Sequence, residues 1–176
     1  MIIDLIAVLI ALASLVTVYF QIQINTKTVK ADFIYRLKND FYSKKSMLIL
    51  FFIEKDLITF TESNKVCESY FAIKEKEVKE LPIQFKVFIN FAEKSNYAIH
   101  IQEMDNFVLG YLEDIGEFYD RKIFDIKYIS NAFGYYIIKV LENKAIDKYL
   151  KWDREEKYCQ NDYKLFEKLA KEIQNK

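Results

Sequence analysis

The chain has 176 residues, with 26 basic and 26 acidic side chains and a formal net charge of zero. This balance argues against nucleic acid as a partner, because domains that bind it concentrate lysine and arginine on one face. Two cysteines, three glycines and one proline argue against a disulfide framework, a glycine-rich phosphate loop and a β-sandwich. The scarcity of helix breakers predicts a mainly α fold.

The chain begins with a long apolar stretch. From Leu5 to Phe20 it carries no charge, and only Ser14 and Thr17 are polar. With Ile22 included, the stretch approaches the roughly 20 helical residues that cross the hydrocarbon core of a bilayer. A signal peptide would need a cationic start and a small-residue cleavage site, and a core helix would show a polar stripe. We therefore predict a transmembrane helix within an anchor that covers residues 1–24.

Basic residues follow this stretch and predict its orientation. They are Lys27, Lys30, Arg36 and Lys38, whereas Asp4 is the only charged side chain before it. By the positive-inside rule, the N-terminus lies outside and the body of the protein in the cytoplasm of a bacterium, at its inner membrane. Two pairs of small residues, four positions apart, would let two such helices approach closely: Ala7 with Ala11, and Ala13 with Thr17. They indicate a homo-oligomer only weakly.

Residues 25–45 predict an amphipathic stalk helix. Apolar residues recur near helical period at Ile22, Val29, Phe33, Leu37 and Phe41, so this face must meet either the body or a second stalk. The next apolar run, Met47 to Ile53, is too short to span a bilayer and has charged residues on both sides. It predicts a buried core helix at the start of a cytoplasmic domain, residues 46–176.

The cytoplasmic domain predicts a helical bundle with a small β-hairpin near residues 56–74. The hairpin follows from two short β-prone runs separated by turn residues, and it would have to pack on helices. Four helical segments follow from apolar periodicity and capping residues. They begin at Pro82, at about Gln102, at Asp125 and at about Asn161.

Few residues predict catalysis or metal binding. His100 is the only histidine, and Cys67 and Cys159 are far apart, so neither a two-histidine metal site nor a paired-cysteine site is indicated. His100 fits a surface or partly buried helix end. The sequence therefore predicts no enzymatic activity and no cofactor. A metal-dependent hydrolase is a minor alternative.

Two charged tracts each allow two interpretations. Carboxylates are dense between Glu103 and Asp125 and include Glu113 and Glu117 on one helical face. These carboxylates either bind a divalent cation or form a solvated helix face that pairs with lysine and arginine of neighbouring helices. The tract from Lys144 to Lys157 is basic and aromatic, but nearby carboxylates offset its charge. We favour the solvated face for the first tract and no ligand for the second.

Several short motifs are similar to one family. They are Tyr19-Phe-Gln-Ile-Gln, Ala31-Asp-Phe-Ile-Tyr-Arg-Leu, Val108-Leu-Gly-Tyr-Leu-Glu-Asp-Ile-Gly, Ile123-Phe-Asp, Phe133-Gly-Tyr-Tyr-Ile and Trp152-Asp-Arg. In this order the chain resembles small bacterial single-pass membrane-anchored helical proteins of unknown function. The resemblance implies an all-helical body on one anchor and makes Glu113, Asp125, Gly134 and Arg154 its recurrent positions. Glu113 and Arg154 then form either a buried ion pair or part of a ligand pocket.

Two functions follow as hypotheses. The first is a membrane-tethered interaction module without enzymatic activity, which docks a cytoplasmic protein or its own copies. The second is a membrane effector, in phage defence or a toxin system, which senses a signal through its cytoplasmic domain and perturbs the bilayer on assembly.

Overall fold

The computed structural model describes residues 2–63, 68–155 and 163–175, without the side chains of residues 2–11 and 13. The chain divides into two compact units, Met1–Asn39 and Asp40–Lys176. Cys67 and Cys159 lie outside the described residues, as do Ala7, Ala11 and Ala13 with respect to their side chains.

All described residues of the first unit are helical. Helix α1 covers Ile2–Phe41, and its sequence contains neither proline nor glycine, so nothing in it interrupts the backbone hydrogen bonds. Large apolar side chains from Leu12 to Ile24 are exposed to solvent. Across the part of the chain whose side chains are described, no helix combines the length and apolarity needed to cross a bilayer.

The second unit begins with the last residues of α1. The ring of Phe41 is fully buried and packs edge-to-face on Phe133, with 5.6 Å between ring centroids. Ser43 then caps the next helix, α2 (Lys44–Glu54), by accepting a hydrogen bond from the amide of Ser46. Every residue of α2 from Leu48 to Ile53 is buried. The predicted core helix at Met47–Ile53 is therefore confirmed.

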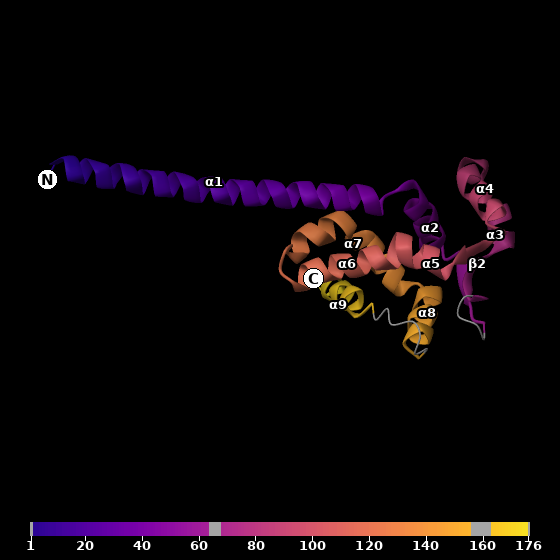
Figure 1. Cartoon of the computed structure of the whole chain (residues 1–176). Coiled ribbons are helices and arrows are strands. Elements are labelled where there is room, and N and C mark those ends of the chain that lie inside the picture. Colours follow the sequence, from indigo (N-terminus) through magenta and orange to yellow (C-terminus); the bar gives the residue numbers. More distant parts are fainter. Residues whose placement is uncertain (1, 64–67, 156–162, 176) are drawn as a thin grey trace. The chain divides into compact units, whose positions relative to one another are not determined.

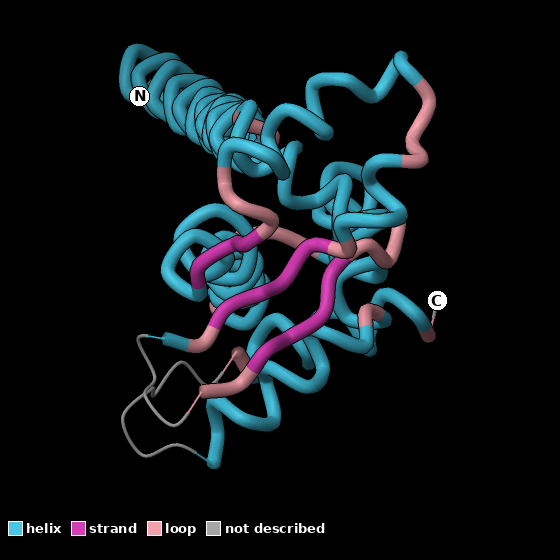
Figure 2. Tube along the Cα trace, turned by 90° about the vertical axis from the view of Figure 1, so that its right-hand side faces the viewer, coloured by secondary structure: helices cyan, strands magenta, loops and turns pink. Residues whose placement is uncertain are grey.

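A three-stranded antiparallel sheet follows α2. Its strands are β1 (Ile58–Thr61), β2 (Tyr70–Ile73) and β3 (Ala98–His100), in the order β1-β2-β3. The predicted hairpin is β1 with β2, and β3 adds a third strand that the sequence analysis did not predict (Figure 2). Phe71 lies opposite Phe60 on one side and Ile99 on the other. The sheet is small, and the rings of Phe60 and Phe71 pack on those of Tyr149 and Trp152, which belong to a helix later in the chain.

Two short helices and a 3₁₀ turn connect β2 to β3. Helix α3 covers Glu75–Lys79, the 3₁₀ turn η2 covers Ile83–Phe85, and helix α4 covers Lys86–Lys94. Pro82 precedes η2, so the predicted helix at this proline opens with a tighter turn. In Figure 1, α3 and α4 stand to one side of the helices that follow β3.

The remaining helices form the larger part of the body. They are α5 (Ile101–Met104), the π-helical turn η3 (Asp105–Leu109), α6 (Gly110–Asp120), α7 (Ile126–Glu142), α8 (Lys144–Glu155) and α9 (Lys164–Gln174). Helices α6, α7 and α9 pack on one another (Figure 1). The predicted mainly α class is confirmed, although the single helix expected from Gln102 is divided by η3. Helices α3 and α8 were not predicted.

Candidate functional site

Buried polar contacts gather where α9 begins. We call this group the α9 docking site, and it consists of side chains from η3, α6 and α8 together with the residues at the start of α9 that they meet. Its members are Asp105, Glu113, Tyr149, Asp153, Arg154, Tyr163 and Glu167.

Glu113 joins α6 to the first turn of α9. Its carboxylate accepts hydrogen bonds from the backbone amides of Leu165 at 3.3 Å and Phe166 at 2.8 Å. The first amides of a helix have no partner within the helix, and the helix dipole favours a negative charge at that end. Glu113 therefore caps α9 from another helix.

Gly116 lies one turn after Glu113 and allows this close approach. A Cβ atom at Gly116 would lie 2.6 Å from the carbonyl carbon of Leu165 and 2.8 Å from the amide nitrogen of Phe166. Both are backbone atoms, which cannot rotate away as a side chain can. Glycine at this position is therefore what lets the backbones of α6 and α9 come together.

Arg154 does not pair with Glu113. Its guanidinium lies 2.7 Å from the carboxylate of Glu167 on α9, with both side chains partly buried. The predicted ion pair between Glu113 and Arg154 is thus wrong, because α9 supplies a closer partner to each. Both residues nevertheless stabilise the same helix, and the alternative of a ligand pocket between them remains a prediction.

Asp105 lies in η3 and meets two tyrosines. The hydroxyl of Tyr149 donates to its two carboxylate oxygens, at 3.0 and 3.2 Å, and the hydroxyl of Tyr163 is also hydrogen-bonded to it. Burial raises the pKa of Asp105, and the two tyrosine hydrogen bonds act in the opposite direction. Burial and the neighbouring carboxylate of Asp105 also raise the pKa values of both tyrosines, so their hydroxyls remain protonated donors.

The backbone around this cluster is unusual at two points. The π-helical turn places one extra residue in the helix at Asp105, a feature that is frequent at functional sites. Tyr163 has a left-handed backbone with φ 38° and ψ 25°, which is costly for a bulky residue. With this left-handed backbone at Tyr163, the centroid of its ring lies 6.4 Å from that of Tyr149. Asp153 is buried beside them and further disfavours ionisation of both hydroxyls.

The sequence analysis missed this cluster. Asp105 was considered only as one of many carboxylates on a solvated face, and α8 was not recognised as a helix. A usable signal was present, because Tyr149 and Asp153 are four residues apart and therefore share one face of α8.

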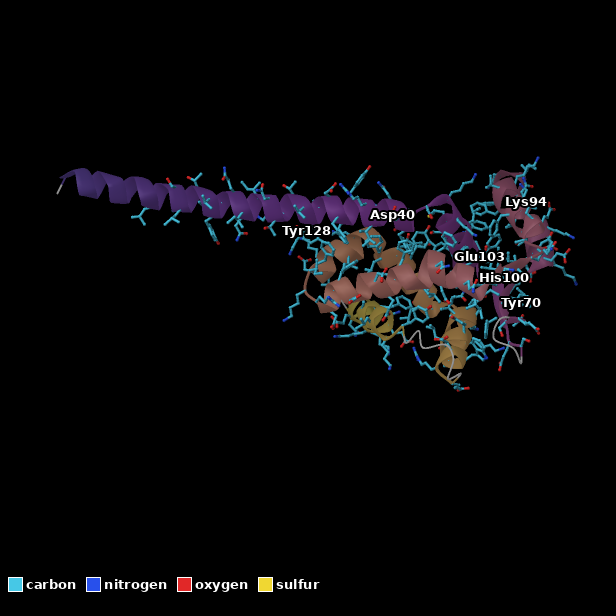
Figure 3. The ribbon with its side chains drawn as sticks, in the orientation of Figure 1. Asp40, Tyr70, Lys94, His100, Glu103 and Tyr128 are labelled. Atoms are coloured by element: carbon cyan, nitrogen blue, oxygen red, sulfur yellow. The ribbon has the colours of Figure 1, made fainter. Side chains whose placement is uncertain are left out.

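The other residues considered in the sequence take structural positions. Asp125 caps α7 by accepting from the amides of Lys127 at 3.0 Å and Tyr128 at 3.2 Å, as predicted from its helix-starting position. His100 is exposed at the start of α5, next to Glu103, whose carboxylate lies 2.6 Å from Lys45 (Figure 3). Gly134 is buried within α7.

Carboxylates of the dense tract between Glu103 and Asp125 form ion pairs with basic residues. Asp120 lies 2.6 Å from Lys168, and Glu117 pairs with Arg121. Within the described ranges, no three acidic, histidine or cysteine side chains are grouped so as to hold a metal ion. In the basic and aromatic tract, Trp152 is buried against the ring of Phe60 and does not face solvent.

Asp125 also lines a surface hollow of about 450 Å³. The hollow lies between α9 and the connection from α6 to α7, and its lining carries both signs of charge. Its lysines are Lys122 and Lys168, of which Lys168 pairs with Asp120.

Comparison with protein-family models, with curated proteins and with solved structures finds no match to this chain.

Proposed function

We propose that this chain is a membrane-tethered helical interaction module. The first part of α1 crosses the bacterial cell membrane, and the second unit lies in the cytoplasm, where it binds a protein partner or further copies of the chain. The family resemblance seen in the motifs points to the same organisation and supplies no activity. The polar groups of the α9 docking site hold one helix against the others, which suits a binding scaffold.

The observation that carries the proposal is the exposure of large apolar side chains on α1. Leu15 is 67% exposed and Phe20 is 60% exposed. Similar exposure holds for Leu12, Val16, Val18, Tyr19, Ile22 and Ile24. At 3.6 residues per turn these positions extend over about two thirds of the circumference of the helix, so one protein face cannot cover them all, whereas lipid can. The charge-free stretch from Leu5 to Phe20 supplies most of the required length.

The orientation follows from the residues after this stretch. Lys27, Lys30, Arg36 and Lys38 lie on α1 beyond Ile22, and an excess of basic residues marks the cytoplasmic side of a span. A second unit placed on that side would meet cytoplasmic proteins.

Membrane extraction of the full chain tests the anchor. The protein, expressed in a bacterium, should stay in the membrane pellet after an alkaline carbonate wash. Leu12→Arg together with Val16→Arg should release it, because each arginine at the centre of a span costs about 3 kcal/mol. Thr26→Arg together with Thr28→Arg adds the same charge beyond the stretch and should leave the protein in the pellet. Recovery of the unaltered chain in the soluble fraction would refute the anchor.

A face of α7 supports the binding role. Tyr128 and Tyr135 are exposed and lie two helical turns apart, so they share one side of the helix (Figure 3 labels Tyr128). Exposed tyrosines are enriched in protein interfaces. If copies of the chain meet here, Tyr128→Ser with Tyr135→Ser should lower the native mass of the full chain in detergent.

The small residues of α1 favour the membrane effector as a second candidate. Thr17 pairs with Ala13, and Ala11 with Ala7, in the spacing that lets two membrane helices pack closely. Ala7→Leu with Ala11→Leu should then abolish an oligomer and also any loss of membrane potential on induced expression. An unchanged membrane potential on expression of the unaltered chain would exclude this candidate.

A further inference from the structure

An exposed surface of the second unit combines apolar and basic side chains. We call it the α2–α4 face, and it consists of the exposed residues Lys44, Ile83, Lys86, Val87 and Lys94, together with Leu48, which is buried but lines the hollow between the two helices. Ile83 is 81% exposed and Val87 is 57% exposed, which is unusual for aliphatic side chains of this size. Figure 3 labels Lys94 on α4, away from α6, α7 and α9.

The exposed aliphatic residues are not needed by the core beneath them. The inner face of α4 already packs on α2. The ring of Phe88 stacks on that of Phe51 with 3.7 Å between ring centroids, and the ring centroid of Phe91 lies 5.9 Å from that of Phe52. Ile83 and Val87 contribute little to this core, since more than half of each residue is exposed. With Asn90 and Lys94 they recur at steps of three or four residues, so they line one side of the segment.

The charged side chains of this face are all lysines. Lys44, Lys86 and Lys94 are exposed, and among the described residues no carboxylate lies within ion-pair distance of their ammonium groups. Glu93, the one acidic residue of α4, interacts with Lys79 of α3 instead. A hollow of about 270 Å³ separates Lys44 and Leu48 on α2 from Val87 and Lys94 on α4.

We propose that the α2–α4 face docks on the surface of an anionic phospholipid bilayer. Aliphatic side chains between lysines are the combination that binds such surfaces, because the former enter the boundary of the acyl chains and the latter attract the headgroups. The inference rests on the proposed membrane anchor, since a tether keeps the second unit at a high effective concentration near the lipid. Docking would hold the second unit against the membrane that anchors it.

Flotation and hydrogen exchange of the full chain test this. The protein is reconstituted into neutral phosphatidylcholine vesicles and into vesicles that also contain phosphatidylglycerol. Amides of residues 83–94 should exchange several-fold more slowly on the anionic vesicles, because each lysine near such a surface strengthens binding by a factor of roughly five. High salt should remove the difference, since it screens the attraction.

Matched charge reversals identify the surface. Lys86→Glu with Lys94→Glu should abolish the protection of residues 83–94. Lys127→Glu with Lys171→Glu makes the same change in net charge at exposed positions of α7 and α9 and should preserve it. Ile83→Ser with Val87→Ser should also reduce it, and circular dichroism checks that each variant is folded.

Each remaining outcome has one meaning. Equal exchange on both kinds of vesicle overturns the docking, and so does equal loss in both charge-reversed variants. Protection by soluble polyglutamate but not by anionic vesicles would replace lipid with an acidic protein partner. Flotation with anionic but not neutral vesicles, with residues 83–94 protected, would refute the anchor while supporting the face.

Discussion

The carboxylate of Glu113 on α6 accepts a 2.8 Å hydrogen bond from the backbone amide of Phe166 on α9, 53 residues later in the sequence. A charged acceptor at a helix start satisfies an amide that would otherwise lack a partner, and it also interacts with the helix dipole. The contact thus stabilises the packing of α9, the last helix of the described chain, on α6.

Replacing Gly116 by alanine should destabilise the fold. The new Cβ would contact backbone atoms of Leu165 and Phe166 below 3 Å, so α9 would have to shift. We expect a loss of about 2–3 kcal/mol in the free energy of unfolding, despite the better helix propensity of alanine. Urea unfolding followed by circular dichroism measures it.

Gly134 provides the matched control for that substitution. There the nearest atom to a new Cβ is the side-chain oxygen of Ser130, at 3.1 Å, and a serine side chain has other rotamers. Gly134→Ala should change the free energy of unfolding by less than about 1 kcal/mol. Equal effects at the two glycines would contradict the close packing of α6 on α9.

A double-mutant cycle should assign the partner of Arg154. Because its guanidinium contacts Glu167 in a partly buried pair, we expect a coupling energy of about 0.5–1 kcal/mol between Arg154→Gln and Glu167→Gln. The same cycle between Arg154 and Glu113 should give a smaller value. A larger coupling to Glu113 would restore the ion pair expected from the sequence.

Asp105 should make stability depend on pH. Burial raises its pKa above the model-peptide value of 3.8, so the folded state favours the protonated form. Its contribution is fully present below that value and is lost as pH rises through the folded pKa. Asp105→Asn should therefore gain stability relative to the unaltered chain as pH rises from about 3 to 7.

The tyrosines provide the control for this titration. Tyr149→Phe removes a hydrogen bond that lowers the pKa of Asp105, so the loss of stability should extend up to a higher folded pKa and be larger at neutral pH. Parallel pH profiles for Asp105→Asn and the unaltered chain would show that Asp105 titrates normally.

Asp125 should act as a helix cap and not as a residue that binds a ligand. Asp125→Ala removes the acceptor for the amides of Lys127 and Tyr128, and we expect a loss of about 1 kcal/mol. Asp125→Asn keeps an acceptor and should cost less, measured by the same urea unfolding. An unaffected stability in Asp125→Ala would show that α7 starts without this cap.

Local signals account for what was predicted correctly. The apolar run of α2, the hairpin of β1 and β2, and the cap at Asp125 each depend on residues close in the sequence. β3 was missed because its three residues gain strand geometry only by pairing with β2. α8 was missed because the tract from Lys144 to Lys157 was considered for its basic and aromatic residues and not for its helical period.

The sequence by itself determined that this chain is mainly helical, that Leu5 to Phe20 form a charge-free apolar stretch, and that Asp125 starts a helix. These properties follow from composition, periodicity and capping, which act over a few residues. Only the tertiary structure decided that Glu113 caps α9, that Arg154 pairs with Glu167, and that Asp105 meets Tyr149. Those partners lie 13 to 53 residues apart, and packing of α6, α8 and α9 selects them from many side chains of equal charge.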